Sequence, residues 1–206
     1  MSMRVVRNST SRAPISGIDL PTPLPAVNKP SQLLVGKVGQ VFWLRVEGRG
    51  SFENSMQAKR AFAAVIDQGM SHLVVDLQAC STMDSTFLGM LTGTAIALME
   101  LGRGTLCVVN VSGRNQQLLS DLGLDQILEV DLAGTRWTEE RQFVCRELAA
   151  CESLAQDRDH DQQARHVLQS HEELAGLCAE NQRRFHDVID FLKRQIASPG
   201  DRPAGV

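Results

Sequence analysis

The sequence predicts an α/β domain with a largely parallel sheet, followed by an α-helical extension. Three observations support this prediction. Short β-branched apolar runs alternate with amphipathic segments of helical period between residues 33 and 132. Helices that lie between strands imply crossovers, and crossovers connect parallel strands. Beyond residue 132 the composition shifts to helix formers, and the segment 138–197 contains one glycine and no proline.

The two ends of the chain have the composition of unstructured tails. The first 31 residues contain five prolines and no periodic apolar pattern. These prolines are Pro14, Pro21, Pro23, Pro25 and Pro30. Such a composition does not support a packed core. We therefore expect a disordered tail at 1–31, the α/β domain at 32–134, the helical extension at 135–197 and a flexible tail at 198–206.

The composition argues against several classes of protein. With 43% apolar and 22% charged residues, the chain is typical of globular proteins. Its net charge of −3 gives no reason to expect direct binding to nucleic acid or to an anionic membrane. No apolar run approaches membrane-spanning length, and the N-terminus lacks an apolar signal core. The five cysteines show no paired spacing, which favours a reducing compartment, so we expect a cytoplasmic protein.

The domain is expected to begin with two strands and a helix. Apolar runs at 33–35 and 41–46 predict the strands, with a glycine-containing turn between them. The helix that follows has Asn54 as its expected N-cap, with Gln57 at the capping-box position. Gly69 is expected to end this helix.

One strand–loop–helix stretch organises the domain. A buried strand is predicted at 73–77, and a small polar loop at 78–83. Asp84, Ser85 and Thr86 then open an amphipathic helix. The strand therefore delivers a carboxylate and two hydroxyls to a helix N-terminus at the end of the sheet. That placement suits an exposed site on a rigid scaffold.

The remaining elements complete the alternating pattern. The helix after Asp84 carries Gly89 and Gly93 four residues apart, so another backbone can approach it closely there. A buried strand is predicted at 105–109, and Ser112 is expected to cap a short helix. The last strand is predicted at 127–130.

Four short motifs, in this order, resemble those of STAS domains. They are Asp76-Leu77 at the end of a strand, Met83-Asp84-Ser85-Thr86 at a helix start, Leu88-Gly89 within that helix, and the pattern Leu-x-x-Leu-Gly-Leu at 119–124. More narrowly, residues 33–132 resemble the bacterial anti-anti-sigma factors, which are antagonists of anti-sigma factors. The resemblance implies a STAS-like mixed, largely parallel sheet packed with helices.

The resemblance also implies a function for Ser85. In that family the serine directly after the aspartate is phosphorylated by an anti-sigma factor serine kinase, and the unphosphorylated protein binds this kinase. A serine phosphatase restores the unphosphorylated form. Ser85 is thus the implied phosphoacceptor of a partner-switching pathway, with Thr86 as the secondary candidate.

The same resemblance implies which residues border the partner. They are Met83, Asp84, Thr86 and Phe87, together with the loop residues Gly50, Ser51 and Phe52. Two positions depart from the family pattern. Phe87 stands where glycine is usual, and no aspartate lies near Ser51. Both departures can change the choice of partner.

A phosphate on Ser85 would act through its charge. It adds roughly −1.5 to −2 charges, which a helix N-terminus can receive, so the fold should survive. A partner surface that fits a neutral hydroxyl would instead meet charge and bulk. The plain alternative is that Ser85 or Asp84 only caps the helix.

The extension carries a heptad-like seam of mainly apolar residues. Its members are Val167, His171, Leu174, Cys178, Asn181, Phe185, Val188 and Leu192. Two arrangements would bury it: a helical hairpin packed on the domain or on itself, or a coiled-coil homodimer with Asn181 facing Asn181. The seam is short and impure, which favours the intramolecular arrangement. We expect that arrangement to leave the Ser85 end of the sheet open for a partner.

Other candidate sites are weak. Asp159-His160-Asp161, His166 and His171 are better explained by a solvated helix or turn than by a metal site. Cys80 is expected to be a small filler residue. No nucleophile–base–acid set is recognisable, so we expect no catalytic residue, metal, cofactor or enzymatic activity. Two rivals to the switch are a stressosome-like scaffold subunit, whose extension drives assembly, and a small-ligand-sensing STAS module.

Overall fold

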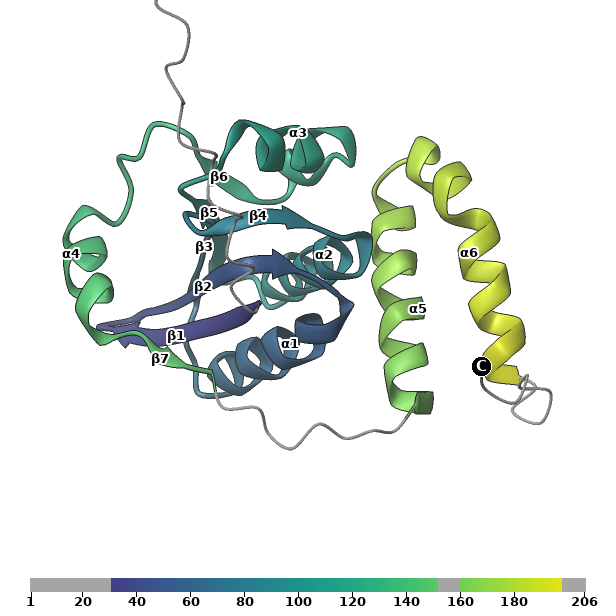
Figure 1. Cartoon of the computed structure of the whole chain (residues 1–206), viewed down its shortest axis with the longest axis horizontal. Helices are drawn as coiled ribbons and strands as arrows, with labels where there is room; N and C mark the ends of the chain where they lie inside the picture. The colour runs from purple at the N-terminus through teal and green to yellow at the C-terminus, as the bar shows by residue number, and fades with distance from the viewer. Residues whose placement is uncertain (1–30, 152–159, 198–206) are drawn as a thin grey trace, which may run out of the picture.

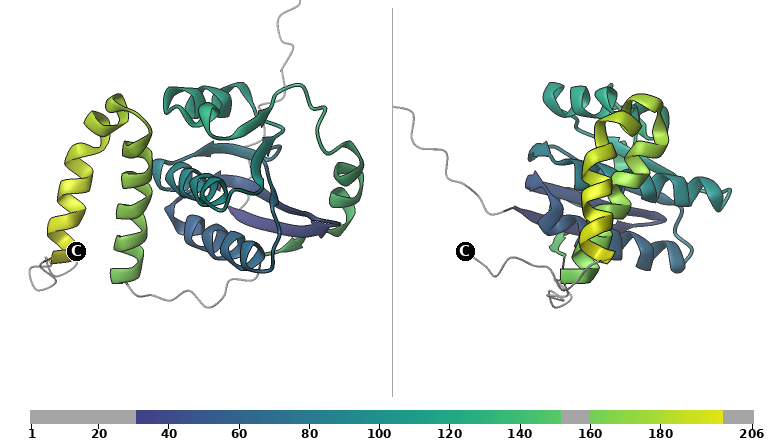
Figure 2. Two further views of the ribbon diagram at one scale, coloured as in Figure 1. Left: turned by 180° about the vertical axis from the view of Figure 1, so that it is seen from behind. Right: turned by 90° about the vertical axis from the view of Figure 1, so that its right-hand side faces the viewer.

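The computed structural model describes residues 31–151 and 160–197. It shows a sheet with helices on both faces and a helical hairpin across one end (Figures 1 and 2). The predicted tails, apart from Ser31, and Asp159 lie outside the described residues. Among the residues described, no helix is long and apolar enough to cross a membrane.

The sheet is largely parallel, as predicted. Strands β1 (Gln32–Val38) and β2 (Val41–Gly50) form the antiparallel hairpin at its start. Strands β3 (His72–Asp76), β5 (Thr105–Val109) and β6 (Glu129–Asp131) then add in parallel, each to its neighbour. The strand order along the sheet is β6-β5-β3-β2-β1-β7. The predicted fold class is therefore confirmed.

Two short strands were not predicted. Strand β4 (Cys80–Met83) pairs in parallel with the end of β2, within the stretch expected to be a loop. Strand β7 (Ala149–Ala150) pairs antiparallel with β1. Neither segment contains a β-branched apolar run, so each is a strand only because a partner strand lies beside it.

Three helices cover one face of the sheet. They are α1 (Phe52–Asp67), α2 (Ser85–Glu100) and α3 (Gly113–Asp121), with the 3-10 turn η1 (Leu124–Gln126) after them. Their buried side chains and one face of the strands form the larger of two apolar clusters. Asp84 and Ser112 are the N-caps of α2 and α3, as the sequence predicted.

The cap of α1 differs from the prediction. Ser51, not Asn54, is its N-cap residue. Asn54 lies three residues into the motif, and its side-chain oxygen accepts a hydrogen bond of 2.9 Å from the Ser51 N–H. Its amide group also donates to the Arg49 carbonyl at 2.9 Å. Asn54 therefore takes the reciprocal position of a capping box whose first member is Ser51.

Helix α4 (Thr138–Glu147) packs on the second face of the sheet. A hydrogen-bond network around one buried carboxylate lies on the same side. Asp76 is fully buried. It accepts hydrogen bonds from Trp43 Nε1 at 3.2 Å and Arg45 Nε at 2.8 Å. It also accepts hydrogen bonds from the Gln78 N–H at 3.0 Å and Asn110 Nδ2 at 2.8 Å. These bonds connect β2, β3 and the end of β5.

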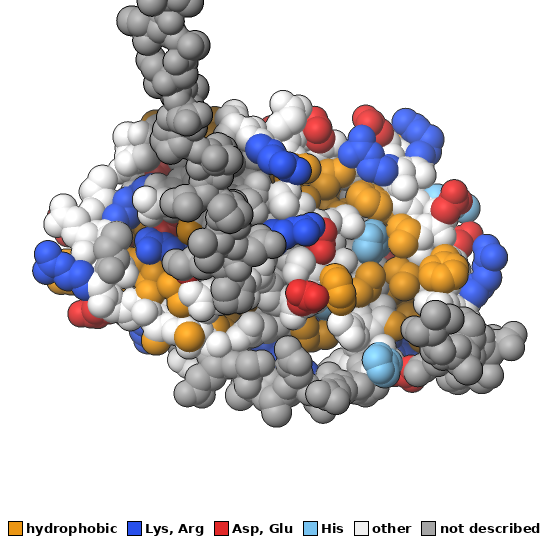
Figure 3. Space-filling view, viewed as in Figure 1, with side chains coloured by type: hydrophobic (Ala, Val, Ile, Leu, Met, Phe, Trp, Pro, Cys, Tyr) orange, Lys and Arg blue, Asp and Glu red, His pale blue; other side chains and the backbone are white. Residues whose placement is uncertain are grey.

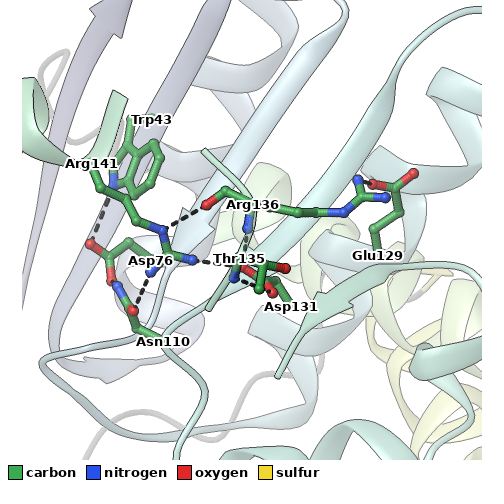
Figure 4. Close-up of polar contacts among 8 residues, drawn as sticks. All are labelled: Trp43, Asp76, Asn110, Glu129, Asp131, Thr135, Arg136 and Arg141. Carbon is green, nitrogen blue, oxygen red and sulfur yellow. Dashed lines mark hydrogen bonds and ion pairs between the residues drawn. The ribbon is translucent and has the colours of Figure 1, made fainter. Parts of the chain in front are cut away.

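Arg141 extends this network to α4 (Figure 4). Its guanidinium donates to Asn110 Oδ1 at 2.6 Å, to Asp131 Oδ2 at 2.8 Å and to the Arg136 carbonyl at 2.8 Å. Asp131 also accepts hydrogen bonds from the backbone N–H groups of Thr135 and Arg136. The carboxyl ends of β3, β5 and β6 are thereby tied to one helix.

The extension folds as a helical hairpin. Helices α5 (His160–Leu177) and α6 (Ala179–Ala197) are separated at Cys178, so the heptad-like seam is bent in its middle. Helix α5 packs on α2, and α6 packs on α5. Asn181 is fully buried within the chain and donates to the Leu122 and Leu174 carbonyls at 2.8 and 3.0 Å. On the face drawn in Figure 3, hydrophobic side chains gather along this hairpin.

The Asp76 network generates a first prediction. Replacing Asp76 by Asn keeps the shape but removes the charge and points an amide donor at other donors. We expect Asp76→Asn to lower the free energy of unfolding by about 3 kcal/mol. Urea denaturation followed by circular dichroism measures this loss. The matched control is Asp121→Asn at an exposed position of α3, where a change within about 0.5 kcal/mol is expected. Equal unfolding midpoints for the two variants would contradict the prediction.

Candidate functional site

The candidate site lies where the N-terminal ends of α1 and α2 meet, and one carboxylate joins them. Asp84 Oδ1 accepts a hydrogen bond of 2.9 Å from the Phe87 N–H, which caps α2. Its Oδ2 accepts a bond of 2.9 Å from the N–H of Phe52, the first residue of α1. The Asp84 N–H in turn donates to the Gly50 carbonyl at 2.9 Å. The two helix starts are therefore held in a fixed relation.

Ser85 is the first residue of α2 and is half-buried. Its Oγ lies 3.0 Å from Nε2 of His171 on α5. The other ring nitrogen, Nδ1, lies 2.8 Å from the Val167 carbonyl, which can only accept a hydrogen bond, so Nδ1 carries the hydrogen. In the neutral ring Nε2 is then an acceptor, and the Ser85 hydroxyl donates to it. The predicted phosphoacceptor is thus hydrogen-bonded to the extension.

The expectation that the extension leaves Ser85 open is wrong. Helix α5 lies across the starts of α1 and α2 (Figure 1). The close approach predicted at Gly89 is found, because a Cβ added there would lie 2.0 Å from the Ser170 carbonyl oxygen of α5. At Gly93 an added Cβ would meet only the side chain of Glu173, at 3.3 Å. Glycine at position 89 therefore lets the extension dock on the surface that was expected to stay free.

A second histidine of α5 makes an equivalent contact with α1. His166 is 3% exposed, and its Nε2 lies 2.8 Å from Oγ of Ser55 in the first turn of α1. Burial, together with the positive charges of Lys59 and Arg60, lowers the pKa of His166 to about 4. His166 is therefore neutral at pH 7 while α5 is docked. The two serine–histidine contacts place α5 over both helix starts.

The residues expected to border a partner divide into two groups. Ser51 and Asp84 are half-buried, and Phe52 is 45% exposed. The buried group consists of Gly50, Met83, Thr86 and Phe87. These four residues lie beneath the surface, and their contribution to partner binding stays a prediction. Thr86, at 4% exposure, is less accessible than Ser85.

The packing of the core explains why a bulky residue stands at position 87 in this chain. Its side chain is fully buried, and a Cβ added at Gly50 would lie 2.9 Å from its ring. The ring therefore fills the core directly beneath the loop at the end of β2. Phe87 can influence a partner only through the backbone that it supports, not by direct contact.

Sequence reasoning missed both histidines as parts of this site. His166 and His171 were assigned to a solvated helix, but both are buried. One signal was available, because His171 interrupts an otherwise largely apolar seam and a buried polar side chain requires a partner. The identity of that partner depends on how α5 crosses the domain, which the sequence does not encode locally.

The remaining candidates do not form a second site. Cys80 is buried and packs in the main core, and burial raises the pKa of its thiol. Within 31–151 and 160–197, no group of three or more His, Cys, Asp or Glu side chains could hold a metal ion. A cavity of about 270 Å³ lies between α1, α2 and α5, with Phe62, Ile66 and Met90 among its apolar lining.

Comparison with known proteins gives a family match. The model of the STAS domain matches residues 33–136. Several solved structures are similar, including the following two. An anti-sigma factor antagonist from Mycobacterium paratuberculosis is 19% identical, with a TM-score of 0.45, over 60% of this chain and all (100%) of that one. The Bacillus cell fate determinant SpoIIAA in its phosphorylated form is 19% identical, with a TM-score of 0.42, over 55% of this chain and 99% of that one. No curated protein matches.

The burial of His166 predicts that acid loosens the hairpin. Its pKa in the docked state, about 4, lies below the ordinary value of 6.5. The docked state is therefore favoured above pH 6.5, and this contribution is lost as the pH falls toward 4. We expect the protection of α5 amides, measured as the exchange rate relative to the intrinsic rate at each pH, to fall over this range more in the natural protein than in His166→Gln, whose amide can still reach Ser55. Parallel pH profiles for the two proteins would show that His166 does not couple docking to pH.

Proposed function

The chain belongs to the STAS domain family, and on this premise we propose that it is an anti-sigma factor antagonist: a phosphorylation-controlled protein-binding switch in bacterial partner switching. Unphosphorylated Ser85 permits binding to an anti-sigma factor serine kinase, which then phosphorylates it. A serine phosphatase reverses the modification. The protein acts in the cytoplasm and does not contact nucleic acid directly.

The observation that carries this proposal is the position of Ser85. Its hydroxyl is the first side chain of α2, and the carboxylate of Asp84 fixes that helix start against α1. The positive end of the helix dipole receives a phosphate, so modification need not unfold the domain. The adjacent Asp84 carboxylate and the phosphate together would make the same surface strongly negative. A single modification therefore changes the surface and leaves its scaffold in place.

The contact between Ser85 and His171 supports a binding function rather than catalysis. A histidine beside a serine hydroxyl is one part of a nucleophilic site. Here the other ring nitrogen bonds to a carbonyl of its own helix, so no carboxylate orients the ring. The pair also lies in a helix–helix contact, one turn from the close approach at Gly89. We therefore propose that the protein is not an enzyme.

The phosphoacceptor assignment predicts where phosphate appears. When the full-length protein is purified from a host that contains its cognate kinase, we expect phosphate on Ser85 and none on Thr86, because Thr86 is buried. Peptide mass spectrometry locates the group. Ser85→Ala should abolish the modification, and Thr86→Ala should retain it. Phosphate found only at other positions, with Ser85 unmodified, would refute the assignment.

A negative charge at position 85 should weaken binding to the kinase but leave the stability of the fold nearly unchanged. Ser85→Asp places a carboxylate at a helix N-terminus, so we expect the unfolding free energy to change by no more than about 1 kcal/mol. Binding to the kinase should fall at least tenfold, which corresponds to about 1.4 kcal/mol. Ser120→Asp, which adds the same charge at an exposed position of α3, is the control for both measurements. An unfolded Ser85→Asp protein would show that Ser85 is structural.

A further inference from the structure

We propose that the α5–α6 hairpin is a removable cover, and that α5 and the external partner compete for one helix-docking surface. This surface is the side of α2 from Ser85 to Gly93 that α5 covers, together with the first turn of α1. The proposal rests on the function proposed above, because it concerns how the partner reaches Ser85. The external competitor is the serine kinase, and the internal one is the chain's own α5.

Helix α5 lies over both helix starts. It contacts the start of α1 through His166 and Ser55, at 2.8 Å, and the start of α2 through His171 and Ser85, at 3.0 Å. Its backbone passes directly over Gly89, one turn beyond Ser85. A kinase must bring its phosphate donor in line with the Ser85 hydroxyl. Helix α5 occupies that space and also engages the hydroxyl.

The contact between Ser85 and His171 leaves no room for a phosphate. The distance of 3.0 Å from Ser85 Oγ to His171 Nε2 is a direct hydrogen bond, with no space for a phosphoryl group between the two atoms. The imidazole packs edge to face against the ring of Phe185 on α6, with 5.4 Å between the ring centroids. The backbone of α5 already touches α2 at Gly89. A phosphate on Ser85 and a docked α5 therefore exclude each other.

The hairpin packs imperfectly on the domain. The cavity of about 270 Å³ lies within the contact between α5 and helices α1 and α2. Two buried polar atoms of the hairpin, His166 Nδ1 and Asn181 Oδ1, have no hydrogen-bond partner. At the edge, Lys59 and Gln169 make an exposed hydrogen bond of 2.7 Å. Leu174 and Phe185 of the hairpin pack in the main apolar cluster, but voids and unpaired polar atoms weaken an interface, so we expect this contact to open before the sheet unfolds.

Competition of this kind sets the affinity for the partner. Only the fraction of molecules with an undocked hairpin can bind, so the apparent dissociation constant rises by the inverse of that fraction. A hairpin docked in about 99% of molecules weakens binding about a hundredfold. Loosening the hairpin would raise the affinity without any change at Ser85.

A pair of glycine variants isolates the cover. Gly89→Ala adds a methyl group that must displace the backbone of α5, whereas Gly93→Ala meets only the flexible side chain of Glu173. Both changes raise the helix propensity of α2 equally. Any difference between them therefore reports the position of α5 and not the stability of α2.

The readout is the accessibility of position 85 in the full-length chain, measured without a partner. Ser85→Cys introduces a thiol there, and a bulky maleimide–polyethylene glycol reagent labels it only when α5 has moved away. Peptide mass spectrometry assigns each labelled site. Buried Cys80 reports on unfolding of the domain, and exposed Cys178 reports on the reagent. We expect Gly89→Ala to speed labelling at position 85 at least tenfold over Gly93→Ala, with Cys80 unlabelled.

Equal labelling rates in the two glycine variants, with Cys80 protected, would overturn the proposal. If Gly89→Ala exposes Cys80, that variant unfolds the domain and cannot test the cover. Phe185→Ala then provides the test, since it removes the ring that packs against His171 within the hairpin. Faster labelling at position 85 with Cys80 protected supports the cover, and unchanged labelling refutes it. These results do not depend on phosphorylation. The proposed function fails separately, if Ser85 remains unphosphorylated by the kinase even in Gly89→Ala.

Discussion

The carboxylate of Asp84 is the interaction on which the candidate site depends. Its two oxygens accept the Phe87 and Phe52 N–H groups, so one side chain caps α2 and also satisfies the first amide of α1. Without it, two helix starts would each leave an amide unpaired at the same place. Because α1 and α2 begin side by side, a single crossing helix can cover both. Asp84 therefore fixes the position of Ser85 and the pair of helix starts on which α5 docks.

A second constraint acts on the opposite face of the sheet. Asp76 is fully buried at the end of β3, and Arg141 extends its hydrogen-bond network to α4. A buried carboxylate is costly unless donors surround it, and here Trp43, Arg45 and Asn110 are among them. This network holds the strands from which β4 and α2 continue. The strands that carry the site are therefore held by hydrogen bonds that involve no residue of the hairpin, so they can stay in place if the hairpin moves.

The sequence was sufficient for the parts of the fold that local chemistry determines. Apolar runs located β3 and β5, and Asp84 marked the start of α2. Strand β4 was missed because its four residues become a strand only beside β2, a contact between distant segments. The cap of α1 was misplaced by three residues because Ser51 and Asn54 both suit the position. Local patterns therefore located the elements but not the pairings between distant segments.

The docking of the extension was beyond such reasoning for a similar physical cause. Gly89 indicated that some backbone could approach α2, but not which one. His171 indicated a polar group within a seam, but not that its partner is Ser85. Each signal had several explanations, and only the crossing of α5 over α2 combines them. Interfaces between a domain and its extension are specified by such pairs, so neither half identifies the contact alone.

The positive ends of the two helix dipoles explain why one surface can have two occupants. Helix starts disfavour a nearby cation and favour an anion. With α5 docked, the start of α1 faces His166, whose pKa is lowered and whose ring is neutral at pH 7. With α5 released, the start of α2 can instead receive the phosphate of modified Ser85. In the proposed switch, one helix start thus faces a neutral imidazole in the docked state, and the neighbouring one receives an anion in the released state. The proposed competition between hairpin docking and phosphorylation arises because both involve the start of α2.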